Sequence, residues 1–172
     1  MSWDPYVAMM TITFDQEENK YTTTGVGSHA AIYGKDGSKW GTTEGFELYA
    51  YEYEIDTGEE VKTKENINEV EIVQGIFNGK TKGGNAGIRI GNKKYMYISE
   101  YEGIHRLSCS GGGAVLAQTG KCLLIAIWDA TNVDSAGKPQ NPGDLENEVR
   151  HPSVPVNKCS QPRYGKTNLR VT

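Results

Sequence analysis

The run KCLLIAIW, residues 121–128, constrains the fold more than any other segment. Every residue after Lys121 in this run is apolar. Successive side chains of a β-strand point to opposite faces of the sheet, so a strand of this composition presents apolar groups on both faces. Such strands are found where both faces are covered. We therefore expect a central strand with a layer on each side, and Cys122 as a buried small hydrophobe.

Short β-rich runs surround this strand in the sequence and are separated by Gly, Asn-Lys or Thr-Gly turns. They are AGIRIG (86–91), KYMYIS (94–99), GIHRLSC (103–109) and GAVLAQ (113–118). An earlier strand over 26–33 and its return over 38–43 are joined by the turn signal KDG. We find no internal repeat, so these strands predict one mainly antiparallel sheet.

Residues 47–65 alternate in polarity and predict a separate hairpin. Tyrosines or Ile occupy the odd positions from 49 to 55, and Glu52 and Glu54 fall between them. Asp56-Thr57-Gly58 is a turn signal, and Val61 begins the return. The pattern is typical of a hairpin with one face in water.

Helical spacing appears in three places. Asp4 and Pro5 are suited to the N-cap and first position of a helix over 4–14. The segment 66–79 has an apolar stripe that includes Ile67, with Asn66 as its expected cap and Gly79 past its end. A last helix is expected in NPGDLENEVR (141–150), where Pro152 prevents continuation. Helices beside an antiparallel sheet indicate the α+β class.

Charge is unevenly distributed along the 172 residues. Residues 151–172 contain four basic and no acidic residues, whereas residues 1–150 carry 14 basic against 22 acidic residues. An acidic body disfavours nucleic-acid binding. We predict a domain over 1–150 and a basic, solvated tail over 151–172.

Other features predict a cytoplasmic protein. The chain has no apolar run of membrane-spanning length, and its start does not resemble a secretory signal. Its three cysteines form no CxxC pair and fit a reducing compartment better than a disulfide framework or a zinc site.

No catalytic arrangement is evident. The segment QGIFNGKT approaches a phosphate-binding loop, but Gln74 stands where that motif requires Gly. His29, His105 and His151 lie in separate segments without metal-ligand spacing. The carboxylates of residues 44–71 are better explained as a solvated face than as a paired acid and base. We predict a protein that is not an enzyme and needs no cofactor.

Four segments, in order, resemble profilins. The start SWDPYV resembles their N-terminal helix, and AAIYGKDGSKW resembles their strand, turn and second Trp. AGIRIGNKKYMYI and GGGAVLAQTGKCLLIAIWD resemble the later strands. The resemblance implies a single domain whose N- and C-terminal helices cover one face of the sheet and whose internal helix covers the other. The long hairpin, closer to insertions in some protist members, and the C-terminus depart from the family pattern.

The resemblance implies two binding sites. Profilins bind proline-rich segments, including those of formins, through an aromatic cleft, and the matching residues are Trp3, Tyr6 and Trp40. Without the resemblance, these aromatics would be interpreted as core residues. Profilins also bind monomeric actin and regulate its polymerisation. Lys94, Arg106, Gly143 and Glu146 fall on the implied actin face, with Lys93 as a neighbour that either contacts actin or merely solubilises its turn.

Two alternatives accompany this interpretation. The shortened last helix is compatible with a proline-motif-binding adaptor that has weak or no actin binding. An antiparallel sheet of this kind could also hold a small-molecule pocket, as in sensor domains. Some profilins bind phosphoinositides, which the acidic body would weaken here. We expect a cytoskeletal monomer without metal.

Overall fold

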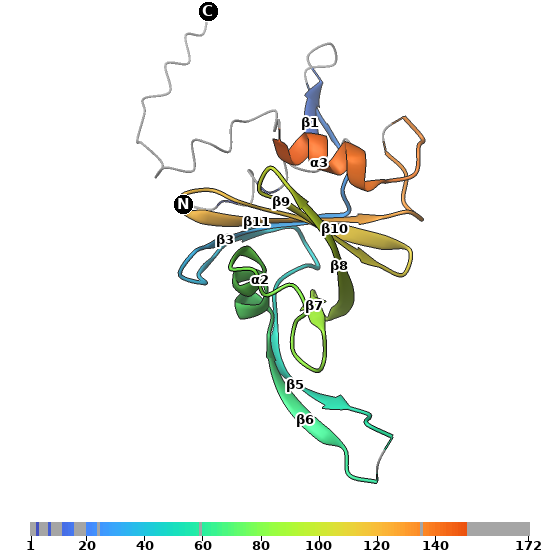
Figure 1. Cartoon of the computed structure of the whole chain (residues 1–172). Coiled ribbons are helices and arrows are strands. Elements are labelled where there is room, and N and C mark those ends of the chain that lie inside the picture. Colours follow the sequence, from blue (N-terminus) through green and yellow to red (C-terminus); the bar gives the residue numbers. More distant parts are fainter. Residues whose placement is uncertain are drawn as a thin grey trace, which may run out of the picture.

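The computed structural model describes residues 3, 7, 12–15, 20–23, 25–58, 60–134 and 136–150. Residues 12–15 and 20–23 are described by their backbone only. Its main feature is a seven-stranded sheet in the order β4-β3-β11-β10-β9-β8-β7, in which all neighbours are antiparallel (Figure 1). The strands are β3 (His29–Gly34), β4 (Lys39–Thr42), β7 (Ile88–Ile90), β8 (Lys93–Tyr101), β9 (Ile104–Cys109), β10 (Gly112–Gln118) and β11 (Cys122–Asp129).

The apolar run of residues 121–128 forms the covered strand that its composition predicts. β11 pairs with β10 on one side and β3 on the other, and its residues from Cys122 to Ile127 are all buried. Cys122 itself is fully buried. The prediction of a central strand with a layer on each face is therefore confirmed.

A helix covers each face of the sheet. On one face, Val73 and Ile76 of α2 (Glu69–Phe77) pack with sheet residues such as Leu116 and Ile125. On the other face, Leu145 and Val149 of α3 (Pro142–Arg150) join Val7 near the N-terminus in a second cluster, with side chains such as Leu124. Val7 is helical, and its N–H donates to the Trp3 carbonyl at 3.1 Å, as in one helical turn. The predicted α+β layers are confirmed.

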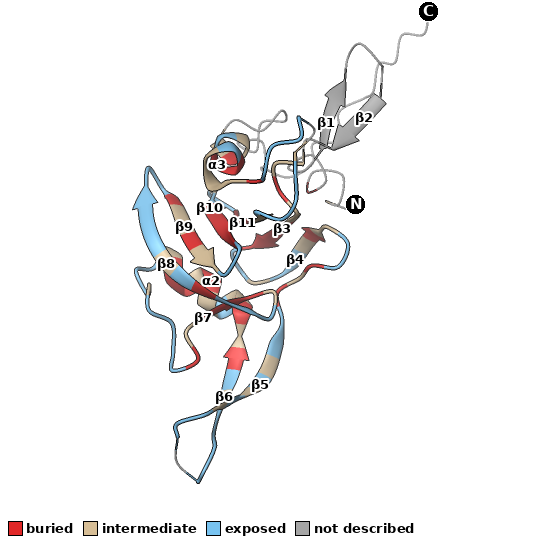
Figure 2. Ribbon diagram, turned by 90° about the vertical axis from the view of Figure 1, so that its right-hand side faces the viewer, coloured by how far each residue is buried: buried red, intermediate tan, exposed pale blue. Residues whose placement is uncertain are grey.

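The predicted hairpin also exists. β5 (Ala50–Ile55) and β6 (Thr63–Asn68) pair with each other outside the main sheet and project from the body (Figure 2). Along β5, exposed and half-buried side chains alternate. Tyr51 and Tyr53 are half-buried, whereas Glu52 and Glu54 are exposed and form ion pairs with Lys64 and Lys62.

Two element boundaries differ from the sequence prediction. The helix expected over 4–14 cannot extend to residue 14, because Ile12–Asp15 form strand β1, which pairs with β2 (Lys20–Thr23). The β-branched and aromatic residues of ITF favour a strand over the helical spacing. α2 begins later than predicted, with Asn68 rather than Asn66 as its N-cap. Ile67 instead lies in β6, opposite Tyr51, because hairpin pairing overrides local helix spacing.

Candidate binding surfaces

Trp3 and Trp40 form a stacked aromatic pair. Their ring centroids lie 5.1 Å apart with an angle of 26° between the planes. Both side chains are half-buried and pack against the cluster that contains Val7 and Val149. Half-buried flat rings of this kind can stack on a ligand as well as on each other.

The elements that hold this pair are an edge strand and a helical turn. Trp40 lies in β4 at the edge of the sheet, where its indole Nε1–H donates to Ser38 Oγ at 3.1 Å. Trp3 begins the turn that ends at Val7. The structure thus brings together Trp3 and Trp40 of the predicted proline site, whereas Tyr6 lies outside the described residues.

Lys94 and Arg106 lie on the face of the sheet that carries α3. Met96, two residues after Lys94, pairs with Ser108, which is two residues after Arg106. Cross-strand partners and residues two apart share a face, so Lys94, Met96 and Arg106 point the same way. We call this surface the Lys94 face.

Lys93 points to the opposite face. It pairs with Ile90, which belongs to the core cluster under α2, and it lines a cavity of about 240 Å³ with Phe46 and Tyr95. Its ammonium donates to the Ser110 carbonyl at 3.4 Å. The predicted neighbour of Lys94 is therefore not part of the Lys94 face.

An apolar strip extends the Lys94 face. β7 pairs with only the first three residues of β8, so β8 has an uncovered edge from Met96 onward. Met96, Ile98 and Tyr101 are 70%, 57% and 66% exposed. Exposed apolar residues that gather in this way mark interaction sites more often than isolated ones. The sequence predicted the lysines but not this strip. Residues 95–98 (YMYI) are all aromatic or apolar, so no alternation with polar residues marked Met96 and Ile98 as exposed.

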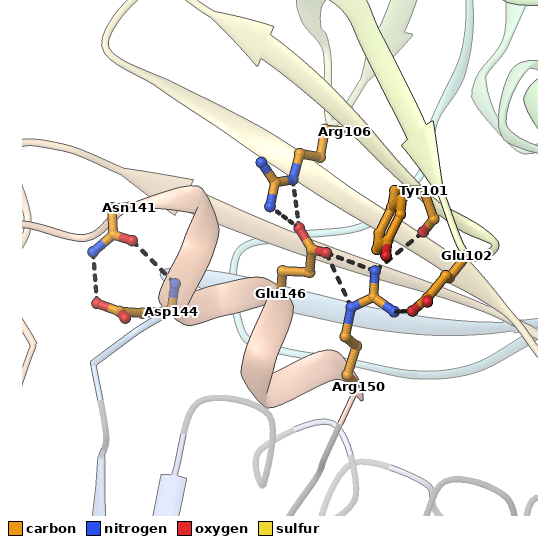
Figure 3. Close-up of polar contacts among 7 residues, drawn as sticks. All are labelled: Tyr101, Glu102, Arg106, Asn141, Asp144, Glu146 and Arg150. Atoms are coloured by element: carbon orange, nitrogen blue, oxygen red, sulfur yellow. Dashed lines mark hydrogen bonds and ion pairs between the residues drawn. The ribbon is translucent and has the colours of Figure 1, made fainter.

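Glu146 is buried between two arginines (Figure 3). It accepts from Arg106 on β9 and from Arg150 Nη2, the latter at 2.7 Å. Burial alone would raise the pKa of Glu146, but hydrogen bonds from Arg150 and Arg106 outweigh it, so that the pKa lies below its ordinary value. Only 8% of the Glu146 side chain is exposed, and its carboxylate holds the Arg106 guanidinium. That Glu146 contacts actin stays a prediction.

Further contacts fix α3 on the sheet. Arg150 binds Glu102 at 2.8 Å and the Tyr101 carbonyl at 3.1 Å, and its guanidinium lies over the Tyr101 ring. At the other end, Asn141 Oδ1 accepts from the Asp144 N–H at 3.0 Å and caps the helix. Gly143, a predicted contact residue, is half-buried in the first turn.

Glu69 joins the hairpin, α2 and the β7–β8 turn. The Glu69 side chain is fully buried, and hydrogen-bond donors surround it. Its Oε1 accepts from Tyr51 Oη at 3.0 Å and from Asn92 N at 2.7 Å. Its Oε2 accepts from Tyr49 N at 3.0 Å and from Gly91 N at 2.7 Å. The prediction of a solvated face is wrong for this carboxylate. Its position in the crowded acidic segment gave no signal of this role.

The described residues offer little for other chemistry. They contain no group of three His, Cys, Asp or Glu side chains placed to hold a metal. His105 contacts Phe77 and Tyr97, and burial lowers its pKa. No helix among the described residues is long and apolar enough to cross a membrane.

Comparisons with known proteins agree on one family. The family model Profilin matches residues 1–150. A profilin of Tetrahymena pyriformis is 31% identical over 153 residues, which cover 86% of this chain and 90% of that protein. Among solved structures, Acanthamoeba castellanii profilin II (TM-score 0.58, 20% identity) and profilin IB (TM-score 0.57, 19% identity) share the fold, each match covering 87% of this chain and 91% of the other. The chain therefore belongs to the profilin family of non-enzymatic, actin-binding regulators.

Proposed function

We propose that this protein binds monomeric actin through the Lys94 face and proline-rich segments, such as those of formins, through the Trp3–Trp40 pair. In the cytoplasm it would regulate polymerisation by carrying actin monomers to proline-rich partners. The observation that carries the proposal is that Lys94 and Arg106 share one face of the sheet with an exposed apolar strip. Two cations beside apolar side chains suit a protein partner with an acidic surface.

The charge of Arg106 is held in place by the fold. The Arg106 side chain is 42% exposed, and its ion pair with the buried Glu146 carboxylate fixes the orientation of the guanidinium. A charge that is already oriented loses less conformational entropy on binding. Such groups fix the orientation of a complex and speed its formation more than they add affinity.

The two lysines allow a matched test of the actin site. Lys93→Glu and Lys94→Glu change the net charge equally, but they alter opposite faces of the sheet. Only the Lys94 substitution changes the proposed actin-binding surface. We expect Lys94→Glu to weaken binding of fluorescently labelled monomeric actin about tenfold or more, and Lys93→Glu to leave it within about twofold. Equal losses in the two variants would mean that net charge, and not this face, determines binding.

The aromatic pair supports the proline site. A polyproline II helix is preformed and loses little entropy on binding, and aromatic rings hold its ridges. We expect Trp3→Ala to weaken binding of a proline-rich peptide at least tenfold, measured by calorimetry, with actin binding unchanged. Trp128→Phe is the control, because Trp128 packs on the same face without joining the pair. A comparable loss in both variants would contradict the assignment.

Binding of proline peptides without actin would favour the adaptor alternative. Phosphoinositide binding, if present, would be weak, because residues 1–150 are acidic.

A further inference from the structure

The chain contains a proline motif of its own shortly after the last residue of α3. Residues 152–155 read PSVP, and they begin two residues after the last residue of α3. A polyproline II helix has three residues per turn, so Pro152 and Pro155 would project from the same edge. This PxxP spacing is the one that aromatic-lined grooves recognise.

The segment follows the end of α3, whose position on the sheet is fixed. Arg150, the last residue of the helix, is tied to Glu146, Glu102 and the Tyr101 carbonyl. One residue earlier, Val149 is buried in the cluster against which Trp3 and Trp40 pack. The chain therefore leaves α3 from the same apolar layer that carries the aromatic pair.

Charge also favours a tail held against the body. Residues 151–172 carry four basic and no acidic residues, whereas residues 1–150 have a clear excess of acidic residues. Attraction between the two raises the local concentration of the tail near the domain. A short tether has the same effect, because it gives an effective concentration on the order of millimolar.

We propose that the Pro152–Pro155 segment occupies the Trp3–Trp40 pair in the free protein and competes with proline-rich partners. The inference rests on the proposed proline site and adds its regulation: an external motif binds only when the tail segment leaves. If the segment's own dissociation constant is about a third of the effective concentration, the tail reduces the apparent affinity for external motifs about fourfold.

The test compares two substitutions in the full chain. Pro155→Ala removes one proline of the motif but keeps Pro152 as the helix stop. Pro162→Ala is the matched control, since it removes a tail proline outside the motif. The first measurement follows the indole N–H signals of Trp3 and Trp40 by NMR without any ligand. The second measures affinity for a decaproline peptide.

We expect Pro155→Ala to shift both indole signals and to bind decaproline at least threefold more tightly, with Pro162→Ala unchanged. Unchanged signals and affinity would overturn the inference. A weaker affinity of Pro155→Ala for decaproline would also overturn the inference, because the segment would then form part of the binding site and not compete for it. Signals that depend on protein concentration would assign the occupant to a neighbouring molecule and not to the same chain. If the signals shift but no variant binds decaproline, the tail contact stands and the proposed binding of proline-rich partners fails.

Discussion

Replacing Glu69 with Gln should destabilise the protein strongly, because the carboxylate is buried among four donors. Each of its oxygens accepts a backbone N–H at 2.7 Å, one from Gly91 and one from Asn92. A glutamine must place its NH₂ group where one of these oxygens was. Whichever way the amide turns, at least one buried backbone N–H loses its acceptor and faces another donor.

The size of the effect follows from this count. An unsatisfied buried N–H costs about 1–3 kcal/mol, and hydrogen bonds to a charged acceptor are worth more than those to a neutral one. We expect the free energy of unfolding to fall by about 3 kcal/mol. For a protein of this size, that corresponds to a decrease in Tm of roughly 6–12 °C.

Glu71→Gln is the matched control for this experiment. Glu71 lies in the same first turn of α2 and interacts with the same helix dipole, but its side chain is exposed. Urea unfolding of the two variants separates burial from charge. A difference of less than about 0.5 kcal/mol between them, the range of ordinary surface substitutions, would refute the reasoning.

Three other perturbations have defined outcomes in urea unfolding. Tyr51→Phe removes the hydroxyl that donates to Glu69 and should cost about 1–2 kcal/mol; no change would show that water replaces it. Gly113→Ala should cost about 1–3 kcal/mol, because a Cβ there would clash with the Leu107 carbonyl oxygen and would lie 2.6 Å from Trp128 Nε1; wild-type stability would mean that both the neighbouring backbone and the indole adjust freely. Since the pKa of Glu146 is lowered in the folded state, its contribution is present above about pH 4.5 and is lost as pH falls through the folded value. Glu146→Gln should therefore lose less stability on acidification than the wild type, and parallel curves would contradict this.

The sequence predicts the sheet well where its signal is local. The run of residues 121–128 is apolar on both faces, so it indicates a covered strand without knowledge of its neighbours. The hairpin of residues 47–65 follows in the same way from alternation and a turn signal. Each of these signals lies within a few residues, which explains why neither needed tertiary information.

Boundaries and buried charges depend on partners distant in sequence. Ile67 fits a helical stripe, but pairing with Tyr51 places it in β6. Glu69 resembles its exposed acidic neighbours in sequence, yet the donors that surround it come from residues 49–51 and 91–92. Glu146 matches a surface position of the family, and only the packing of α3 on β9 shows that Arg106 and Arg150 enclose it.

The shortness of α3 need not abolish either proposed site. A nine-residue helix is unstable alone, so its position must come from tertiary contacts. Leu145 and Val149 supply burial, and Glu146 supplies polar contacts on both sides. Through Arg106 this carboxylate orients a charge on the Lys94 face, and through Arg150 it fixes the point where the proline segment leaves the domain. Two turns of helix can therefore support both surfaces, because the contacts that matter lie in those two turns and not in the length beyond them.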